Sequence, residues 1–271
     1  MMDRPLLLVG CGKMGGAMLE GWLEMGMTAE QIHIIEPYAP MAEDLRGRGL
    51  GAVGDPSALP ADLDPAIVLF AVKPQSMDDA APAFAKFRAP NTAFLSIAAG
   101  KTIAYFENIL GPDAAIVRSM PNTPAAVRRG ITVATANTQT SATQREVCGK
   151  LLEAVGDVAW VEEEGLLDAV TALSGGGPAY VFLLAECMTQ AGIDAGLPAD
   201  LAGRLARTTV SGAGEMMRQS DDTPTTLREN VTSPGGTTAE ALRVLMADDA
   251  WQPLMTRAIA AATARSQELA G

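Results

Sequence analysis

Three glycines near the start of the chain have a spacing that can bring backbone amides close to a phosphate. Gly10, Gly12 and Gly15 form the pattern GxGxxG directly after the apolar residues 6–9. In such a turn the first glycine lets the chain reverse, the second admits a pyrophosphate, and the following helix offers free amides. A bare GxGxxG can be a coincidence in a loop, but its place between a strand and a helix predicts dinucleotide binding.

An acidic residue at the end of the next apolar segment bears on the choice of dinucleotide. Glu36 follows residues 32–35 and lies about 20 residues after Gly15, where a carboxylate can bind both ribose hydroxyls of NAD and repel a 2′-phosphate. Its neighbours Pro37, Tyr38 and Ala39 provide no arginine for such a phosphate. The segment favours NADH over NADPH, unless Glu36 only ends the strand and points to water.

Three further loops follow predicted strands, at residues 72–75, 98–100 and 120–124. Ligands of open α/β sheets bind outside the carboxyl ends of the strands, so these loops are expected to line the nicotinamide end of the site. Lys73 is a candidate for a phosphate or ribose contact, the alternative being a solvated loop lysine.

Two glycine clusters lie within helical sequence, where glycine costs roughly 1 kcal/mol relative to alanine. The cluster at residues 174–180 suggests a kink or a close approach by another backbone or a cofactor. In the cluster at residues 233–240, a flexible turn leads into a helix, and Thr237 and Glu240 have the spacing of a capping box. Free amides at such a helix start can bind a carboxylate without arginine; a helix cap without a ligand is the alternative.

Residues that are missing also restrict the chemistry. Residues 151–271 contain no lysine and no histidine. Reduction of a ketone needs a proton donor beside the carbonyl, and the β-hydroxyacid dehydrogenases, which share a two-domain layout, place a lysine in the helical half. A protonated cyclic imine already carries the positive charge that hydride addition discharges, so orientation and a hydroxyl group can suffice. The helical half therefore suits an iminium substrate.

The elements that must position these residues differ between the two halves. Strands alternate with helices up to about residue 161, which is typical of right-handed βαβ units and a mostly parallel sheet covered on both faces. After Glu164 only helical periodicity remains. The strands are expected at residues 5–10, 32–36, 66–72, 93–99, 115–118, 131–134 and 157–161, and the helices at 14–25, 41–48, 75–87, 102–110, 141–155, 166–191, 198–219, 225–231, 237–247 and 251–269. The predicted domains are residues 1–163, which bind the dinucleotide, and residues 164–271, which are all helical.

The helical half is too apolar to stand alone. Parts of residues 166–191 and 201–217 are apolar on more than one side, and such helices must be buried. An obligate dimer made through this half is the natural hypothesis, and a compact monomeric bundle is the alternative.

Composition excludes several classes of protein. The 271 residues are 48% hydrophobic with 32 acidic and 20 basic residues, which excludes disorder and argues against a nucleic-acid scaffold. Three cysteines without CxxC spacing and a single histidine, His33, indicate neither a disulfide framework nor a metal site. The longest apolar runs fall short of the roughly 20 residues that span a bilayer, and no secretory layout is visible at the start. We expect a soluble, cytoplasmic protein without membrane or nucleic-acid partners.

The chain resembles the pyrroline-5-carboxylate reductases along its whole length. The resemblance is carried by the glycine turn at 10–15 and by residues 71–75, 96–100, 118–124, 173–180 and 231–238; the last two are specific in combination. It implies a Rossmann-like domain followed by an all-helical dimerisation domain, with dimers that often assemble into rings. It also implies reduction of 1-pyrroline-5-carboxylate to L-proline, the last step of proline biosynthesis, by NADPH or NADH.

The resemblance assigns residues to two groups. The cofactor group, completed by Glu36 from the argument above, comprises Gly10, Cys11, Gly12, Lys13, Met14, Glu36, Ala71, Val72, Lys73, Pro74, Ala98 and Ala99. The substrate group comprises Glu164, Asn230, Ser233, Gly235, Gly236, Thr237 and Thr238, with the Thr238 hydroxyl on the ring nitrogen as the catalytic contact. The chain departs from the family at Gly176, where serine is common, and at Glu36, where a small polar residue and NADPH are common. Reduction of a related cyclic imine and a non-catalytic dinucleotide-binding module remain the alternatives.

Overall fold

The structure is a computed structural model that describes residues 3–270. Residues 1, 2 and 271, at which the predicted domains begin and end, lie outside the described residues. The chain divides into two compact units: residues 1–175 together with 262–271, and residues 176–261. The division at 175/176 lies within the helical sequence, about a dozen residues beyond the predicted boundary at 163/164, which remains a prediction about functional domains.

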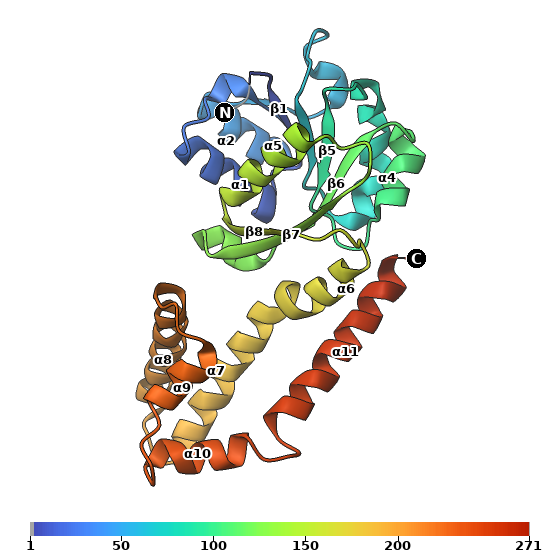
Figure 1. The fold of residues 1–271 in the computed structure, drawn as a ribbon. Coiled ribbons are helices and arrows are strands. Elements are labelled where there is room, and N and C mark those ends of the chain that lie inside the picture. Colours follow the sequence, from blue (N-terminus) through green and yellow to red (C-terminus); the bar gives the residue numbers. More distant parts are fainter. Residues whose placement is uncertain (1–2, 271) are drawn as a thin grey trace. The chain divides into compact units, whose positions relative to one another are not determined.

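An eight-stranded sheet forms the centre of the first unit, in the order β3-β2-β1-β4-β5-β6-β7-β8 (Figure 1). All neighbouring strands are parallel except β6 and β7, which are antiparallel. The strand order reverses direction between β1 and β4, and the carboxyl ends on either side of that point are where a Rossmann-type sheet binds its ligand. The strands are β1 (Leu6–Val9), β2 (Ile32–Ile35), β3 (Gly51–Val53), β4 (Ile67–Phe70), β5 (Ala93–Ser96), β6 (Ala115–Met120), β7 (Gly130–Ala136) and β8 (Gly156–Trp160).

The sheet buries a separate apolar core on each face, because successive strand residues point to opposite sides. Leu6 and Leu8 of β1 belong to one core, and Leu7 and Val9 belong to the other. The first core includes residues of α1 (Lys13–Glu24), α2 (Ala39–Gly47) and α5 (Ala142–Glu153). The second includes residues of α3 (Met77–Ala80) and α4 (Ile103–Leu110). The predicted two-sided α/β sheet is confirmed.

Two local predictions in the first unit were wrong. The three-residue strand β3 was not predicted, because a short segment that begins with glycine has no clear alternation. Residues 75–87, predicted as one helix, form α3 between two 3₁₀ segments, Pro74–Ser76 and Ala81–Phe87. Pro82 lies just inside the second 3₁₀ segment, and a proline has no N–H with which to continue an α-helix.

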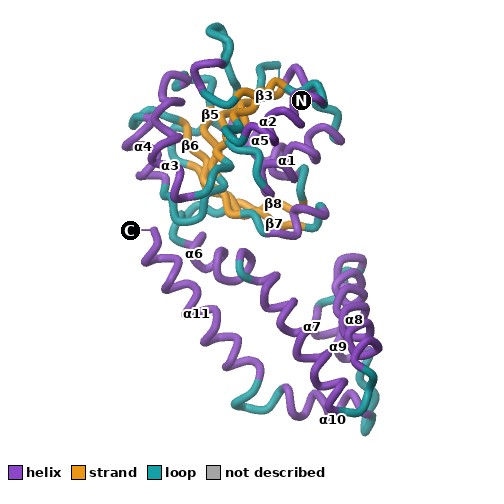
Figure 2. The backbone as a smooth tube through the Cα atoms, turned by 180° about the vertical axis from the view of Figure 1, so that it is seen from behind, coloured by secondary structure: helices purple, strands orange, loops and turns teal. Residues whose placement is uncertain are grey.

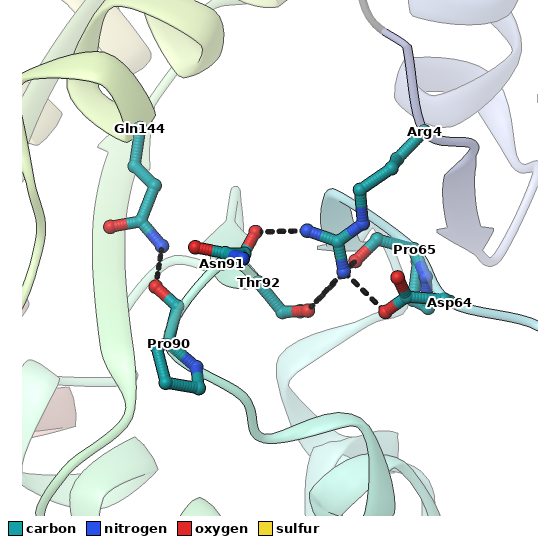
Figure 3. A network of polar contacts seen from close by, with 7 residues as sticks. All are labelled: Arg4, Asp64, Pro65, Pro90, Asn91, Thr92 and Gln144. Atoms are coloured by element: carbon teal, nitrogen blue, oxygen red, sulfur yellow. Dashed lines mark hydrogen bonds and ion pairs between the residues drawn. The ribbon is translucent and has the colours of Figure 1, made fainter.

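One arginine joins the amino ends of three strands (Figure 3). The Arg4 guanidinium donates to the carbonyls of Asn91 and Pro65, at 2.6 and 3.0 Å, and to the Thr92 hydroxyl at 3.2 Å. It also forms an ion pair with Asp64. These residues precede β1, β4 and β5, so Arg4 holds the edge of the sheet opposite the glycine turn.

The second unit contains helices and connecting segments but no strand among its described residues, 176–261 (Figure 2). Its helices are α7 (Gly177–Asp194), α8 (Ala199–Gln219), α9 (Pro224–Asn230), α10 (Thr237–Leu245) and the first part of α11 (Trp251–Ala270). α7 and α8 pack against each other: a Cβ on Gly192 would lie 3.2 Å from the Ala202 side chain. The predicted all-helical second half is confirmed.

Large apolar side chains of the second unit are exposed in the single chain. Val181, Phe182 and Leu183 on α7 are 46%, 63% and 56% exposed, and Met216 on α8 is 58% exposed. The helical segment Leu166–Asp194 has 29 residues and is, by length and composition, apolar enough to cross a membrane. The short apolar runs of the sequence did not suggest this length. The core helix of a soluble protein can meet the same criterion. The exposed apolar surface therefore indicates that something covers this segment, but it does not show whether that is another protein chain or a membrane.

Candidate active site

The backbone of the glycine turn agrees with the role expected for each of its three glycines. Gly10 has a φ of +90°, and a Cβ there would lie 2.8 Å from the Val72 side chain. A Cβ on Gly15 would lie 2.4 Å from the Gly10 carbonyl oxygen, so helix and turn pack too closely for any side chain. Gly12, in contrast, has open space where its Cβ would be. The turn is therefore closed toward the sheet and open at the position where a pyrophosphate approaches.

Glu36 does not point to water. Its carboxylate is buried and accepts hydrogen bonds from the backbone N–H groups of Cys11 and Tyr38, both at 2.9 Å. The first of these bonds joins the end of β2 to the glycine turn, so the negative charge lies beside the turn. Burial, followed by the nearby Glu36 charge, raises the pKa of the Cys11 thiol to about 11. Cys11 therefore remains a neutral thiol near neutral pH.

The loops after β4 and β5 lie beside this turn or at the same edge. The Ala71 N–H donates to the Val9 carbonyl at 2.8 Å, next to Gly10. Lys73 is exposed and Pro74 half-buried at the start of a 3₁₀ turn. Ala98 is buried and Ala99 exposed, and a hydrogen bond from the Ala98 N–H to Ser96 Oγ, at 3.2 Å, shapes the start of their loop. The remaining cofactor candidates, Lys13 and Met14, are the first two residues of α1. Lys13 is exposed and Met14 is half-buried.

Glu164 is already bonded within the first unit. Its Oε1 accepts from Arg118 Nη1 at 2.7 Å and from the Ile103 N–H at 2.8 Å. Arg118 belongs to β6, and Ile103 is the first residue of α4. The carboxylate thus connects the end of β6 to the helix that follows the 98–102 loop.

The glycine cluster at 174–180 coincides with an irregular helix. Residues Thr171–Gly175 form a π-helical turn between α6 (Leu166–Val170) and α7. A Cβ on Gly175 would lie 2.6 Å from the Met120 side chain, and Asn122 donates to Ser174 Oγ at 3.2 Å. The close approach at Gly175 is thus made by a side chain at the end of β6, and not by another backbone or a cofactor as predicted. π-turns of this kind often occur at functional sites.

The remaining substrate candidates lie in the second unit, around the start of α10. Asn230 ends α9, Gly235 has a φ of +68°, and the Gly236 N–H donates to the Ser233 carbonyl at 3.0 Å. The predicted capping box was wrong: Gly236 is the N-cap, with no side-chain cap, and Glu240 pairs with Arg243 at 3.0 Å. Glycine at the N-cap leaves the first amides of the helix without a capping side chain.

The side chains of Thr237 and Thr238 are exposed at this helix start. Among the described residues, none accepts a hydrogen bond from the N–H groups of residues 237–239. Three amides and the positive end of a nine-residue helix are thus available to an anion.

Comparison with known proteins identifies the family of this chain. Over 271 residues, the chain is 40% identical to the pyrroline-5-carboxylate reductase of Pseudomonas aeruginosa, covering 99% of this chain and 98% of the relative. It is 36% identical to the enzyme of that name from Synechocystis, covering 99% of each chain. The chain belongs to the pyrroline-5-carboxylate reductase family.

Two family matches divide the chain between them. Residues 164–269 match the family described as pyrroline-5-carboxylate reductase dimerisation, and residues 6–100 match the family of coenzyme F420-dependent NADP oxidoreductases. The second match contains the glycine turn, Glu36 and the loops after β4 and β5.

Solved structures of pyrroline-5-carboxylate reductases have the same fold. The Coxiella burnetii structure has a TM-score of 0.92 at 31% identity, and the Plasmodium falciparum structure, with NADP bound, has a TM-score of 0.82 at 27% identity. Each comparison covers 100% of both chains. A prephenate dehydrogenase from Aquifex aeolicus, at 17% identity and a TM-score of 0.56, shares only the fold.

Arg118 is the residue of this site that sequence reasoning did not single out. It is buried in β6 and lies 46 residues before its partner Glu164. The sequence does contain a signal: a charged side chain inside an apolar strand needs a buried partner. The sequence alone does not say which carboxylate provides it.

Proposed function

We propose that this pyrroline-5-carboxylate reductase homologue converts 1-pyrroline-5-carboxylate to L-proline, the last step of proline biosynthesis. The observation that carries the proposal is the 40% identity to a relative of that name over essentially the whole of both chains. The intact glycine turn and the open amides at the start of α10 are the features that such a reaction needs.

The cofactor is NAD(P)H, and the residues around the glycine turn fit it. In our proposal the pyrophosphate lies against the amides of residues 12–14, because the N–H groups of Gly10 and Cys11 already donate to Ile35 and Glu36 and shape the turn. The rest of the cofactor is proposed to lie along Ala71, Val72, Lys73, Pro74, Ala98 and Ala99. When bound, the reduced nicotinamide supplies the hydride. Glu36 places a negative charge beside the turn, which supports a preference for NADH over NADPH.

The substrate carboxylate is proposed to bind the free amides at the start of α10, within residues 233–238. The family resemblance also implies contacts from Asn230 and Glu164. A helix N-terminus stabilises a carboxylate without a cationic side chain, which suits a helical half that has no lysine or histidine. The Thr238 hydroxyl is proposed to contact the ring nitrogen and to orient the C=N bond for hydride transfer.

The chain's task in this reaction is orientation. A protonated C=N bond accepts hydride at carbon, its electron pair moves to nitrogen, and the positive charge disappears. Because no alkoxide forms, no side chain has to donate a proton during the transfer. Positioned amides and one hydroxyl group can therefore support the reaction.

Thr238→Ala tests the substrate site. Loss of one hydrogen bond to a charged group, about 1.5–3 kcal/mol, should lower kcat/KM by at most about 100-fold. Thr238→Ser keeps the hydroxyl and should remain close to wild type. An unchanged rate in Thr238→Ala would remove Thr238 from the site.

A substrate panel tests the proposed substrate against the related cyclic imines. Oxidation of NADH and NADPH is followed with 1-pyrroline-5-carboxylate and with its six-membered analogue. The five-membered substrate should give the higher kcat/KM with at least one cofactor. A higher value for the six-membered ring would reassign the substrate while leaving the cyclic-imine chemistry in place.

The assembly is proposed to be a homodimer through the helical domain, residues 164–271, with a ring of dimers as a further step. Support comes from the match to the dimerisation family and from the exposed apolar side chains of α7 and α8. A cytoplasmic location is also proposed, because the three cysteines are free thiols, as is usual in a reducing compartment.

A further inference from the structure

We propose that Arg118 and Glu164 are positioning residues that hold the loop at residues 97–102 in its catalytic conformation. This inference rests on the proposed function, in which Ala98 and Ala99 of that loop contact the cofactor. It gives Glu164 a different role from the substrate contact that the family resemblance implies.

The Glu164 carboxylate accepts two hydrogen bonds from different elements. One oxygen, Oε1, accepts both from Arg118 at 2.7 Å and from the Ile103 N–H at 2.8 Å. Ile103 is the first residue of α4, where a carboxylate satisfies a free amide and is favoured by the helix dipole. The ion pair therefore fixes the point at which the loop becomes a helix.

The pair is shielded from solvent, Arg118 more than Glu164. The side chain of Arg118 is 7% exposed and that of Glu164 is 30% exposed. A buried guanidinium requires its counter-charge, so the carboxylate cannot easily leave Arg118 to bind a ligand.

The next residue of β6, Ser119, holds the other end of the loop. Ser119 Oγ donates to the Ser96 carbonyl at 3.0 Å, and Ser96 Oγ accepts from the Ala98 N–H at 3.2 Å. Arg118 and Ser119 thus act on the end and the beginning of the same loop. Both contacts depend on one strand, whose register sets the loop's position.

Further contacts restrain the middle of the loop. Lys101 forms an ion pair with Asp78 of α3 at 3.0 Å and lies 4.1 Å from the centre of the Tyr105 ring. Gly100 has a φ of +75°, and a Cβ there would lie 3.2 Å from the Leu269 carbonyl oxygen. These contacts restrain the loop between the two ends that Ser119 and the Arg118–Glu164 pair hold.

The test compares Glu164→Gln, Arg118→Lys and the double variant with the wild-type enzyme. Glutamine keeps an acceptor for Ile103 but removes the charge, and lysine keeps the charge but loses the planar guanidinium. Displacement of the loop should lower kcat by roughly 10- to 100-fold in each single variant. The Kd of ADP-ribose, which reports the Glu36 end of the site, should change by less than about 2-fold, and this binding also shows that the variants are folded.

The double variant distinguishes a shared positioning role from direct substrate contact. If the pair acts as a unit, the double variant is no slower than the slower single variant. If Glu164 binds substrate directly, Glu164→Gln raises the KM for 1-pyrroline-5-carboxylate, Arg118→Lys has little effect, and the effects add; this result overturns the inference.

Glu162→Gln is the matched control. Glu162 lies two residues before Glu164 and pairs with Arg145 at 3.0 Å, but its side chain is 84% exposed. Its replacement should leave kcat unchanged. Wild-type kinetics in both single variants would also overturn the inference while the proposed function stands. A wild-type enzyme that does not reduce the substrate would instead refute the proposed function.

Discussion

Glu36 is the residue whose surroundings bear most directly on cofactor choice. Its two backbone hydrogen bonds keep the carboxylate beside the glycine turn, where an NADP 2′-phosphate would meet a fixed negative charge. A mobile surface glutamate would turn away from that phosphate. Because this one is buried and bonded, the repulsion persists.

Glu36→Ser should shift the ratio of kcat/KM for NADH to that for NADPH by roughly 10-fold toward NADPH, since the variant removes one charged hydrogen-bond acceptor. The measurement is steady-state kinetics with both cofactors. Glu43→Ser, an exposed position on α2, is the control and should leave the ratio unchanged. Equal ratios in Glu36→Ser and wild type would refute a role of Glu36 in cofactor choice.

Cys148 is expected to lower the stability of the fold at alkaline pH. Complete burial raises the pKa of its thiol from 9.0 to about 12. Between these values the unfolded chain loses a proton that the folded chain keeps, so stability falls as pH rises. Cys11, whose pKa is raised to about 11, acts in the same direction.

The free energy of unfolding in urea should therefore be lower at about pH 10.5 than at about pH 8, and the decrease should be smaller in Cys148→Ala. The variant will be less stable at both pH values because it leaves a cavity, so the comparison is between the two decreases. An equal decrease in variant and wild type would exclude Cys148 as a source.

At the scale of elements, the amino edge of the sheet and its carboxyl edge have separate tasks. Arg4 holds the amino ends of β1, β4 and β5 (Figure 3). The cofactor candidates lie at the carboxyl ends of the strands. A change at Arg4 should therefore affect stability without affecting catalysis.

Arg4→Ala should destabilise the protein by about 1–2 kcal/mol, because it removes charged hydrogen bonds from a group that is partly exposed. This corresponds to a Tm about 2–8 °C lower, with kcat/KM unchanged. Asp64→Ala removes only the exposed partner and should have a smaller effect. A large loss of activity at unchanged Tm would contradict the separation of the two edges.

The elements also show what the sequence could and could not predict. The glycine turn, the alternation of strands and helices and the all-helical second half follow from local patterns, which is why they were predictable. The Thr237–Glu240 capping pattern was misleading, since the preceding Gly236 takes the cap position. The Arg118–Glu164 pair joins distant segments, and no local pattern specifies it.

At the scale of the whole molecule, the acidic composition and the substrate are compatible. The chain carries a net charge of -12, yet the proposed substrate carries a carboxylate. In the proposed site, backbone amides at the start of α10 would bind that carboxylate regardless of the chain's net charge. The shortage of basic side chains thus agrees with a reaction that needs orientation more than proton donation.

The exposed apolar side chains of the second unit predict that the isolated 28.1 kDa chain is not the stable species. Sedimentation velocity at micromolar concentration, without detergent, should give a dimer or a multiple of it. Phe182→Glu places a charge on the exposed face of α7 and should shift the protein toward monomer or aggregate. A wild-type monomer under these conditions would refute the dimer, and a need for detergent would point to a membrane.

The most direct test of the central claim follows the hydride itself. The wild-type protein is incubated with 1-pyrroline-5-carboxylate and with reduced cofactor that carries deuterium at the transferred position of the nicotinamide. The mass of the proline formed is then measured by mass spectrometry. The account predicts L-proline one mass unit heavier than that formed with unlabelled cofactor. Absence of cofactor oxidation, or proline without the label, would contradict it.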